Sequence, residues 1–187
     1  SDLVVLPSDH HIKNDSIFKS TIHKAIRCVQ NNCIFLIGVK PKNMKCSYGY
    51  ITYSGKETIK KVTGFTEKPN SKLADEIVTK GSSMWNLGIF ILNSGTWLNA
   101  ISITDNKMYR SIKKSWDNRT TDGFFLRPNK SIFSKSPSNS IDYAVMEKAL
   151  SINLEMKIIE LKTQWSDLGE FSSLDTIYKK NHKGNIF

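Results

Sequence analysis

The sequence has no apolar run long enough to cross a membrane and no cysteine pattern typical of a disulfide or zinc framework. Its longest apolar runs, Cys33 to Val39 and Leu87 to Leu92, are far shorter than the roughly 18 residues of a membrane helix. The three cysteines show no Cys-x-x-Cys spacing, and the first residues lack the basic start of a signal peptide. We therefore expect free thiols, a cytoplasmic location and no membrane partner.

The glycines lack the spacing that usually holds a nucleotide phosphate. No Gly-x-Gly pair and no Gly-Lys-Ser/Thr occurs among the ten glycines. Open α/β sheets commonly receive phosphate at a glycine-rich turn between the first strand and the following helix. Either the protein does not bind a nucleotide in that manner, or the given sequence begins after the segment that carries the glycine-rich turn.

Acidic residues are also scarce, with 17 Asp and Glu against 27 Lys and Arg and a formal net charge of +10. The excess lies before Pro137, but no block of Lys and Arg is longer than two residues. This balance favours anionic partners in general. Because we see neither a known module nor basic residues interleaved with aromatics on one element, we expect no nucleic-acid partner and attribute the charge to a lysine-rich surface.

The remaining pattern predicts one α/β domain over residues 1–187 with a mixed, mainly parallel sheet and helices on both faces, in the manner of Rossmann-like folds. Leu3 to Leu6 and Cys33 to Ile37 have the unbroken apolar character of strands buried on both faces. Between them, Asn14-Asp15 is placed to cap an amphipathic helix. Strand, helix and strand together indicate a βαβ unit.

The rest of the chain continues this alternation. Further strands are predicted at Tyr50 to Tyr53, Lys61 to Phe65, Leu87 to Leu92 and Lys157 to Leu161. Helices are predicted from a Ser71 cap, over Thr96 to Ile103 and Met108 to Trp116, from a Ser140 cap through Leu150, and over Phe171 to Lys180. The segment between Trp116 and Ser140 has only a weak pattern.

Two aspartates follow predicted strands at the place where open α/β sheets bind ligands. Asp9 follows the first strand and Asp167 follows the last. Carboxylate oxygens suit Mg²⁺, which commonly takes one or two protein carboxylates and leaves positions for phosphate and water. Both aspartates are equally explained as turn formers or helix caps. His10 beside Asp9 is either part of the same site or one half of a surface pair.

Three further motifs could hold a sugar phosphate. In Glu67-Lys68-Pro69, an acid could accept sugar hydroxyls and a lysine held extended by the proline could pair with phosphate. Asn86 precedes a core strand, and its amide suits a diol. Gly49 would let a ligand approach the backbone. Each motif also has a structural explanation. Glu67 and Lys68 are equally explained as solvated loop charges, Asn86 as a residue whose amide bonds within a turn, and Gly49 as part of a hairpin with surface aromatics.

Taken in order, six motifs spanning nearly the whole chain resemble the bacterial mannose-1-phosphate guanylyltransferases, a family of sugar-phosphate nucleotidyltransferases. Each motif is weak alone, but the ordered set is specific. The motifs are Leu6-Pro7-Ser8-Asp9-His10, Tyr48-Gly49-Tyr50-Ile51, Phe65-Thr66-Glu67-Lys68-Pro69, Trp85-Asn86-Leu87-Gly88-Ile89-Phe90, Ser140 to Lys148 and Trp165-Ser166-Asp167-Leu168-Gly169.

The resemblance implies transfer of GMP from GTP to mannose 1-phosphate, giving GDP-mannose and pyrophosphate with Mg²⁺ as cofactor. A cation between two anionic phosphates, together with a lysine, would lower their repulsion. Asp142 and Tyr143 are expected in the same cleft without an assigned role. The implied metal ligands are Asp9 and Asp167, the implied sugar-phosphate contacts are Gly49, Glu67, Lys68 and Asn86, and the implied catalytic groups are Asp9, Lys68 and Asp167.

The sequence departs from the family pattern in three respects. Ser47 and Glu170 replace the usual Gly and Ser. The family's first strand and glycine-rich loop, which grip the triphosphate, match nothing here, so we expect the C-terminal two-thirds of a nucleotidyltransferase domain. We expect this chain alone to make no GDP-mannose and to leave Leu3 to Leu6 as an exposed apolar edge.

Several alternatives stay open from the sequence. The protein partner is either a second copy or the missing N-terminal fragment. An inactive remnant that binds a sugar phosphate or serves as an interaction module is the main alternative in function. A related sugar-1-phosphate nucleotidyltransferase is another.

Overall fold

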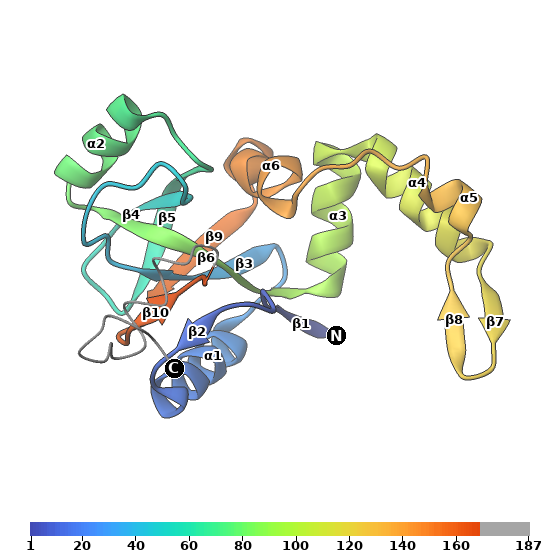
Figure 1. Cartoon of the computed structure of the whole chain (residues 1–187), viewed down its shortest axis with the longest axis horizontal. Coiled ribbons are helices and arrows are strands. Elements are labelled where there is room, and N and C mark those ends of the chain that lie inside the picture. Colours follow the sequence, from blue (N-terminus) through green and yellow to red (C-terminus); the bar gives the residue numbers. More distant parts are fainter. Residues whose placement is uncertain (169–187) are drawn as a thin grey trace, which may run out of the picture.

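The structure is a computed structural model that describes residues 1–168, so Glu170 and the predicted helix Phe171 to Lys180 lie outside the described residues. A six-stranded sheet in the order β1-β6-β3-β9-β5-β4 forms its centre (Figure 1). β4 pairs in addition with the first residues of β6. The strands are β1 (Asp2–Val5), β3 (Cys33–Val39), β4 (Tyr50–Ser54), β5 (Ile59–Thr66), β6 (Ser83–Asn93) and β9 (Glu155–Glu160).

β3 is buried on both faces, as its apolar run predicts. Its side chains alternate, so Ile34 and Leu36 enter one core cluster while Cys33, Phe35 and Ile37 enter the other. Apolar helix residues cover each face. α1 (Asp15–Cys28) closes the second cluster, and α3 (Ser94–Thr104), α6 (Ile141–Ala144) and the 3₁₀ helix η1 (Met146–Ile152) close the first.

The mixed α/β architecture is confirmed, but the expected predominance of parallel pairing is wrong. Of the pairings in the described part of this sheet, only β3 with β9 is parallel. β1 and β3 do run in the same direction on either side of α1, as a βαβ unit requires. However, β6 lies between them and is antiparallel to both, which no local pattern reveals.

β1 is exposed, whereas its apolar run predicts a buried strand. Leu3, Val4 and Val5 are 37–39% exposed. Within residues 1–168, β6 is the only strand that pairs with β1, so the other edge of β1 is open. This agrees with the expectation of an exposed apolar edge at Leu3 to Leu6.

Two short strands bring distant segments together near the sheet. β2 (His11–Ile12) and β10 (Trp165–Ser166) pair antiparallel, with Ser166 opposite His11. This pairing places the residues after β1 beside the residues before Asp167, although more than 150 positions separate them in the sequence. It is the structural reason why the two predicted aspartates belong to one region.

Helix boundaries follow the predictions with local corrections. Asn14 caps α1 through a hydrogen bond from the Ile17 amide, as predicted, whereas Asn70 rather than Ser71 caps α2 (Ser71–Thr79). Ser140 caps α6, but this helix ends at Ala144 and continues as the 3₁₀ helix η1. No helix among residues 1–168 has the length and apolar character to cross a bilayer.

Beyond α3, the chain forms a projection that we call the arm, residues 106–136. It consists of α4 (Asn106–Asp117), the hairpin of β7 (Thr120–Asp122) and β8 (Phe125–Arg127), and α5 (Lys130–Phe133). Figure 1 shows the arm extending away from the sheet. The sequence predicts the helix Met108 to Trp116 within it but not the hairpin.

Candidate active site

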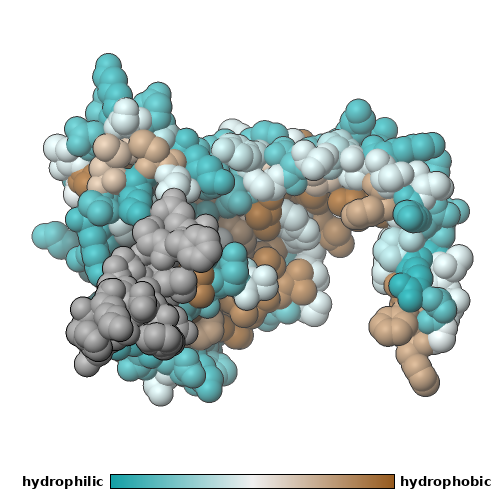
Figure 2. Space-filling model, viewed as in Figure 1, coloured by the Kyte–Doolittle hydropathy of each residue, from teal (hydrophilic) through white to brown (hydrophobic). Residues whose placement is uncertain are grey.

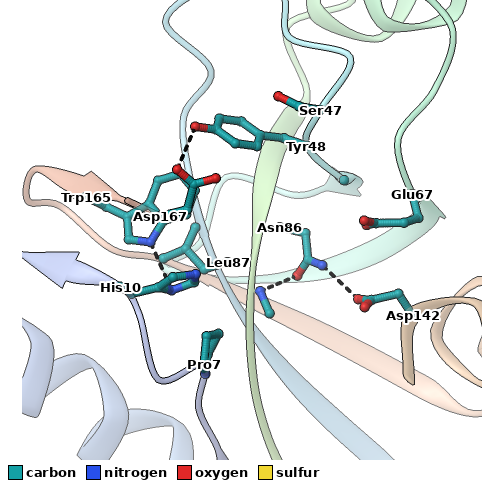
Figure 3. A pocket seen from close by; sticks show the side chains of 12 residues that line it. Pro7, His10, Ser47, Tyr48, Glu67, Asn86, Leu87, Asp142, Trp165 and Asp167 are labelled. Atoms are coloured by element: carbon teal, nitrogen blue, oxygen red, sulfur yellow. Dashed lines mark hydrogen bonds between the residues drawn. The ribbon is translucent and has the colours of Figure 1, made fainter. Parts of the chain in front are cut away.

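Loops from five parts of the fold meet in a cleft of about 170 Å³ beside the sheet (Figure 3). Loops follow β1 and β5, precede β4 and flank β10, and the first half of strand β6 contributes the fifth part. Asp142 of α6 completes the wall. The lining residues are Pro7, His10, Ser47, Tyr48, Gly49, Glu67, Asn86, Leu87, Gly88, Asp142, Trp165 and Asp167.

Most of the predicted site residues reach this cleft. Gly49, Glu67, Asn86 and Asp167 line it, and Figure 3 places Asn86 between an end with His10 and Asp167 and an end with Glu67 and Asp142. Asp9 and Lys68 are not among the lining residues within 1–168; both are exposed beside the cleft. The structure thus brings the set together without assigning the roles, which stay predictions.

Gly49, Glu67 and Asn86 are in direct contact. The backbone N–H of Asn86 donates a hydrogen bond of 2.8 Å to the Gly49 carbonyl. A Cβ at position 49 would collide with Oε2 of Glu67 and lie 3.1 Å from Cβ of Asn86. Only glycine therefore lets the Glu67 carboxylate occupy its place in the cleft.

The side chain of Asn86 is held at both ends. Its Oδ1 accepts a 2.9 Å hydrogen bond from the Gly88 amide, and its Nδ2 donates a 3.0 Å hydrogen bond to Oδ1 of Asp142. These two bonds fix the amide orientation, with the donor toward Asp142. Asp142 thereby gains a part in the site that its motif alone did not indicate.

The Glu67 end of the cleft is rich in carboxylates. Burial, and then repulsion from Asp142 and Glu147, raise the pKa of Glu67 to about 7, although Lys68 and Asn86 oppose the shift. Burial likewise raises the pKa of Asp142. Glu147 accepts a 2.8 Å hydrogen bond from the Glu67 amide, and so fixes the backbone at that point. A ligand that donates hydrogen bonds would relieve this crowding of acceptors.

Lys68 places a cation beside this end. Its Nζ lies 3.8 Å from Oε1 of Glu67, and its side chain is 59% exposed against 12% for Glu67. The backbone of Lys68 adopts φ +44°, so the expectation that Pro69 holds it extended is wrong. The tight turn after β5 overrides the local preference of a residue before proline. Leu168, next to Asp167, also has a positive φ of +50°.

Such left-handed conformations are costly for residues other than glycine and often occur at functional sites. Lys68 and Leu168 are therefore two sites of local backbone strain, each beside a predicted site residue.

At the other end, aromatic residues position Asp167 and His10. The Tyr48 hydroxyl donates a 3.3 Å hydrogen bond to Oδ1 of Asp167. Nε1 of Trp165 donates a 3.2 Å hydrogen bond to Nδ1 of His10, and the two rings pack edge to face. His10 is therefore part of the site and not one half of a surface pair. The only sequence signal for a site role of His10 was its place beside Asp9.

The charges around His10 link both predicted metal ligands. Burial lowers the pKa of His10, and the carboxylates of Asp9 and Asp167 act in the opposite direction. Both aspartates thus lie within electrostatic reach of the same imidazole. Among residues 1–168, no group of three or more His, Cys, Asp or Glu side chains is arranged to hold a metal by itself. Two carboxylates would suit Mg²⁺, which commonly takes one or two protein carboxylates, and the metal role of Asp9 and Asp167 stays a prediction.

Relatives of known sequence match almost the whole chain. The xanthan biosynthesis protein XanB of Xanthomonas campestris pv. campestris (strain B100) is 31% identical over 183 residues, covering 98% of this chain and 38% of that protein. A mannose-1-phosphate guanylyltransferase of Escherichia coli is 31% identical over 190 residues, covering 98% of this chain and 40% of that protein. The chain therefore spans about two fifths of the length of these relatives.

Solved structures share the fold. One described as mannose-1-phosphate geranyltransferase from Thermus thermophilus gives a TM-score of 0.82 at 23% identity, covering 96% of this chain and 50% of the other. One described as mannose-6-phosphate isomerase from Helicobacter pylori gives 0.78 at 26% identity, covering 88% and 63%. A family model for nucleotidyl transferases matches residues 1–184. The family resemblance of the six motifs is thereby confirmed, and the chain belongs to the nucleotidyl transferase family.

Proposed function

We propose that this chain forms the acceptor side of an enzyme that transfers GMP from GTP to mannose 1-phosphate. A phosphate oxygen of mannose 1-phosphate would bond to the α-phosphorus of GTP. The bond from that phosphorus to the bridging oxygen would break, so that GDP-mannose forms and pyrophosphate leaves. The observation that carries the proposal is the contact of Gly49, Glu67, Asn86 and Asp142 at one end of a cleft whose other end holds Asp167.

The first of these ends suits a sugar. Glu67 and Asp142 offer acceptor oxygens at close range, and hydroxyl groups are donors that such carboxylates can bind without a counter-charge. The oriented Asn86 amide and the bare backbone at Gly49 limit the shape of what can enter. Lys68 lies at the rim, where it can pair with a phosphate on the sugar.

The second end suits Mg²⁺ and phosphate. Asp9 and Asp167 would hold the ion, and the Tyr48 hydroxyl keeps one carboxylate oxygen of Asp167 in a fixed orientation. When bound, Mg²⁺ would supply positive charge against the phosphates of both substrates. Trp165 holds the imidazole of His10 beside this end, and burial lowers the pKa of His10.

The names of several relatives support the substrate. Relatives from Escherichia coli, Vibrio cholerae and Salmonella typhimurium carry the name mannose-1-phosphate guanylyltransferase, in the second case as a putative one. The 187 residues contain no Gly-x-Gly turn to bind the triphosphate. We therefore propose that this chain binds the acceptor, mannose 1-phosphate, rather than the nucleotide.

The test is a calorimetric titration of the full chain with mannose 1-phosphate. We expect saturable binding that Asn86→Ala weakens and that Asn99→Ala, an exposed amide on α3, leaves unchanged. Equal affinity in the two variants would overturn the assignment of the cleft. Binding that depends on Asn86, without pyrophosphate release from added GTP, is the result expected of an acceptor side that has no Gly-x-Gly turn for the triphosphate.

A further inference from the structure

The end of the arm is an apolar surface that serves no packing role within the described chain. Phe124, Phe125 and Leu126 form the turn and the start of β8, with exposed fractions of 105%, 65% and 53%. Trp116, at the end of α4, is 45% exposed. Figure 2 shows the apolar residues at the free end of the projection. Removing them from water would be favourable, so three consecutive exposed apolar residues indicate a binding surface.

The arm is held together without these residues. Oγ of Ser115, a side chain with no exposed surface, donates a 2.9 Å hydrogen bond to the Asn129 carbonyl, and the Asn129 amide donates in return to the Ser115 carbonyl. Oγ of Ser111 donates to the Ile132 carbonyl. These bonds fasten α4 to α5 at the base of the hairpin. Polar substitutions at the tip should therefore leave the arm folded.

Positive charge surrounds this apolar tip. Residues 106–136 contain eight Lys and Arg against two acidic residues. Each acid is already paired within the arm, Asp117 with Lys113 and Asp122 with Arg127. Arg119 lies 4.8 Å from the Trp116 ring centre and Arg127 lies 5.3 Å from that of Phe125, so guanidinium groups flank the aromatics. The unpaired excess favours an anionic partner.

We propose that the arm docks on an anionic lipid bilayer surface, with Phe124, Phe125 and Leu126 entering the interfacial region. Aromatic and aliphatic side chains partition to that depth, while basic side chains behind them meet lipid phosphates. The order of groups along the arm matches this requirement, because the apolar residues lie at the tip and most of the cations lie on the helices behind it. The expectation of no membrane partner rested on spanning segments, not on surface contact.

Two other occupants fit the same observations less well. A second copy would bring another arm of the same net charge close to this one, and the tip residues offer far less area than a stable dimer buries. Nucleic acid could stack on Phe124 or Phe125, but it would leave the exposed aliphatic side chain of Leu126 without an apolar partner. The lipid surface satisfies both the apolar and the charged groups.

The test is co-sedimentation of the full chain with vesicles of phosphatidylglycerol mixed with phosphatidylcholine, compared with phosphatidylcholine alone. We expect binding to the anionic vesicles only, weakened by salt. The double variant Phe124→Ser/Phe125→Ser should bind roughly tenfold more weakly, and Leu98→Ser, an exposed apolar residue on α3, should bind as the wild type does. In a separate variant, Phe124→Trp, the fluorescence emission should shift to the blue when vesicles are added.

Several results would overturn the proposal. The first is no sedimentation with anionic vesicles, and the second is equal binding by the double serine variant. A third is loss of a dimer in that variant during sedimentation velocity, which would identify the tip as an interface between copies. Tighter binding to a single-stranded polynucleotide that depends on Phe124 and Phe125 would identify a nucleic-acid surface instead. None of these results bears on mannose 1-phosphate binding, so the proposed function is tested separately.

Discussion

Asn86 and Asp142 are joined by a 3.0 Å hydrogen bond that links β6 to α6 across the cleft. The bond orients the Asn86 amide and ties two segments that lie 56 positions apart in the sequence. Its partner bond, from the Gly88 amide to Asn86 Oδ1, leaves the side chain little freedom. This pair therefore fixes the side chain at the centre of the proposed acceptor site.

Replacement of Asp142 should release Asn86. In Asp142→Ala the Nδ2 donor loses its charged partner, which is worth about 1–3 kcal/mol, so mannose 1-phosphate should bind roughly tenfold more weakly. Asp142→Asn keeps an acceptor oxygen and should retain most of the affinity. Calorimetry on both variants checks this. If the alanine and asparagine variants bind alike, the hydrogen bond does not position the site.

An added methyl group at Gly49 should displace the Glu67 carboxylate, because a Cβ there would occupy the same space as Oε2. We expect Gly49→Ala to lower acceptor affinity by roughly tenfold or more, in proportion to a lost charged hydrogen bond. Gly95→Ala, in the first turn of α3, meets only Asn93 Oδ1 at 3.2 Å and serves as the control. Unchanged binding by Gly49→Ala would show that Glu67 has no role there.

Burial of Glu67 should make stability depend on pH. Its pKa rises from the ordinary 4.5 to about 7 on folding, so the folded state binds more protons between these values and stability falls as pH rises through them. The raised pKa of Asp142 acts in the same direction. Glu67→Gln has no charge to bury. Its Tm should exceed that of the wild type by a few degrees at about pH 8 and by much less at about pH 5. The same Tm difference at both pH values would contradict the burial argument.

Metal dependence should reside in Asp167. If Asp9 and Asp167 hold Mg²⁺, the ion should tighten binding of mannose 1-phosphate and chelator should reverse the effect. Asp167→Asn should lose this response while melting as the wild type does, and Asp75→Asn, an exposed residue on α2, should keep it. Titration with and without Mg²⁺ is the measurement. A full Mg²⁺ response in Asp167→Asn would remove this residue from the metal site.

The sequence was informative where local pattern and burial coincide. β3 has an unbroken apolar run and is indeed buried on both faces, and α1 follows its apolar spacing and its Asn14 cap. The helices predicted over Thr96 to Ile103 and Met108 to Trp116 are present as α3 and α4. The candidate residues at Gly49, Glu67, Asn86 and Asp167 also converge, because motifs at strand ends are brought together by the sheet.

What the sequence did not predict depends on contacts between distant segments. The place of β6 between β1 and β3 is set by pairing across the whole chain, so the proportion of parallel strands was wrong. The positive φ of Lys68 arises from a turn that overrides the influence of Pro69. The partnership of His10 with Trp165 depends on the β2–β10 pairing, which involves only two residues on each strand.

The most direct test of the central claim is a nuclear magnetic resonance titration of the isotope-labelled chain with mannose 1-phosphate. If the cleft is the acceptor site, the amide signals of Gly49, Glu67, Asn86 and Gly88 should shift together with one saturation curve, while signals from the arm stay in place. Glucose 1-phosphate and inorganic phosphate should produce smaller shifts at the same concentrations. The account would be contradicted if these four signals stayed unchanged while others moved, or if inorganic phosphate reproduced the full pattern.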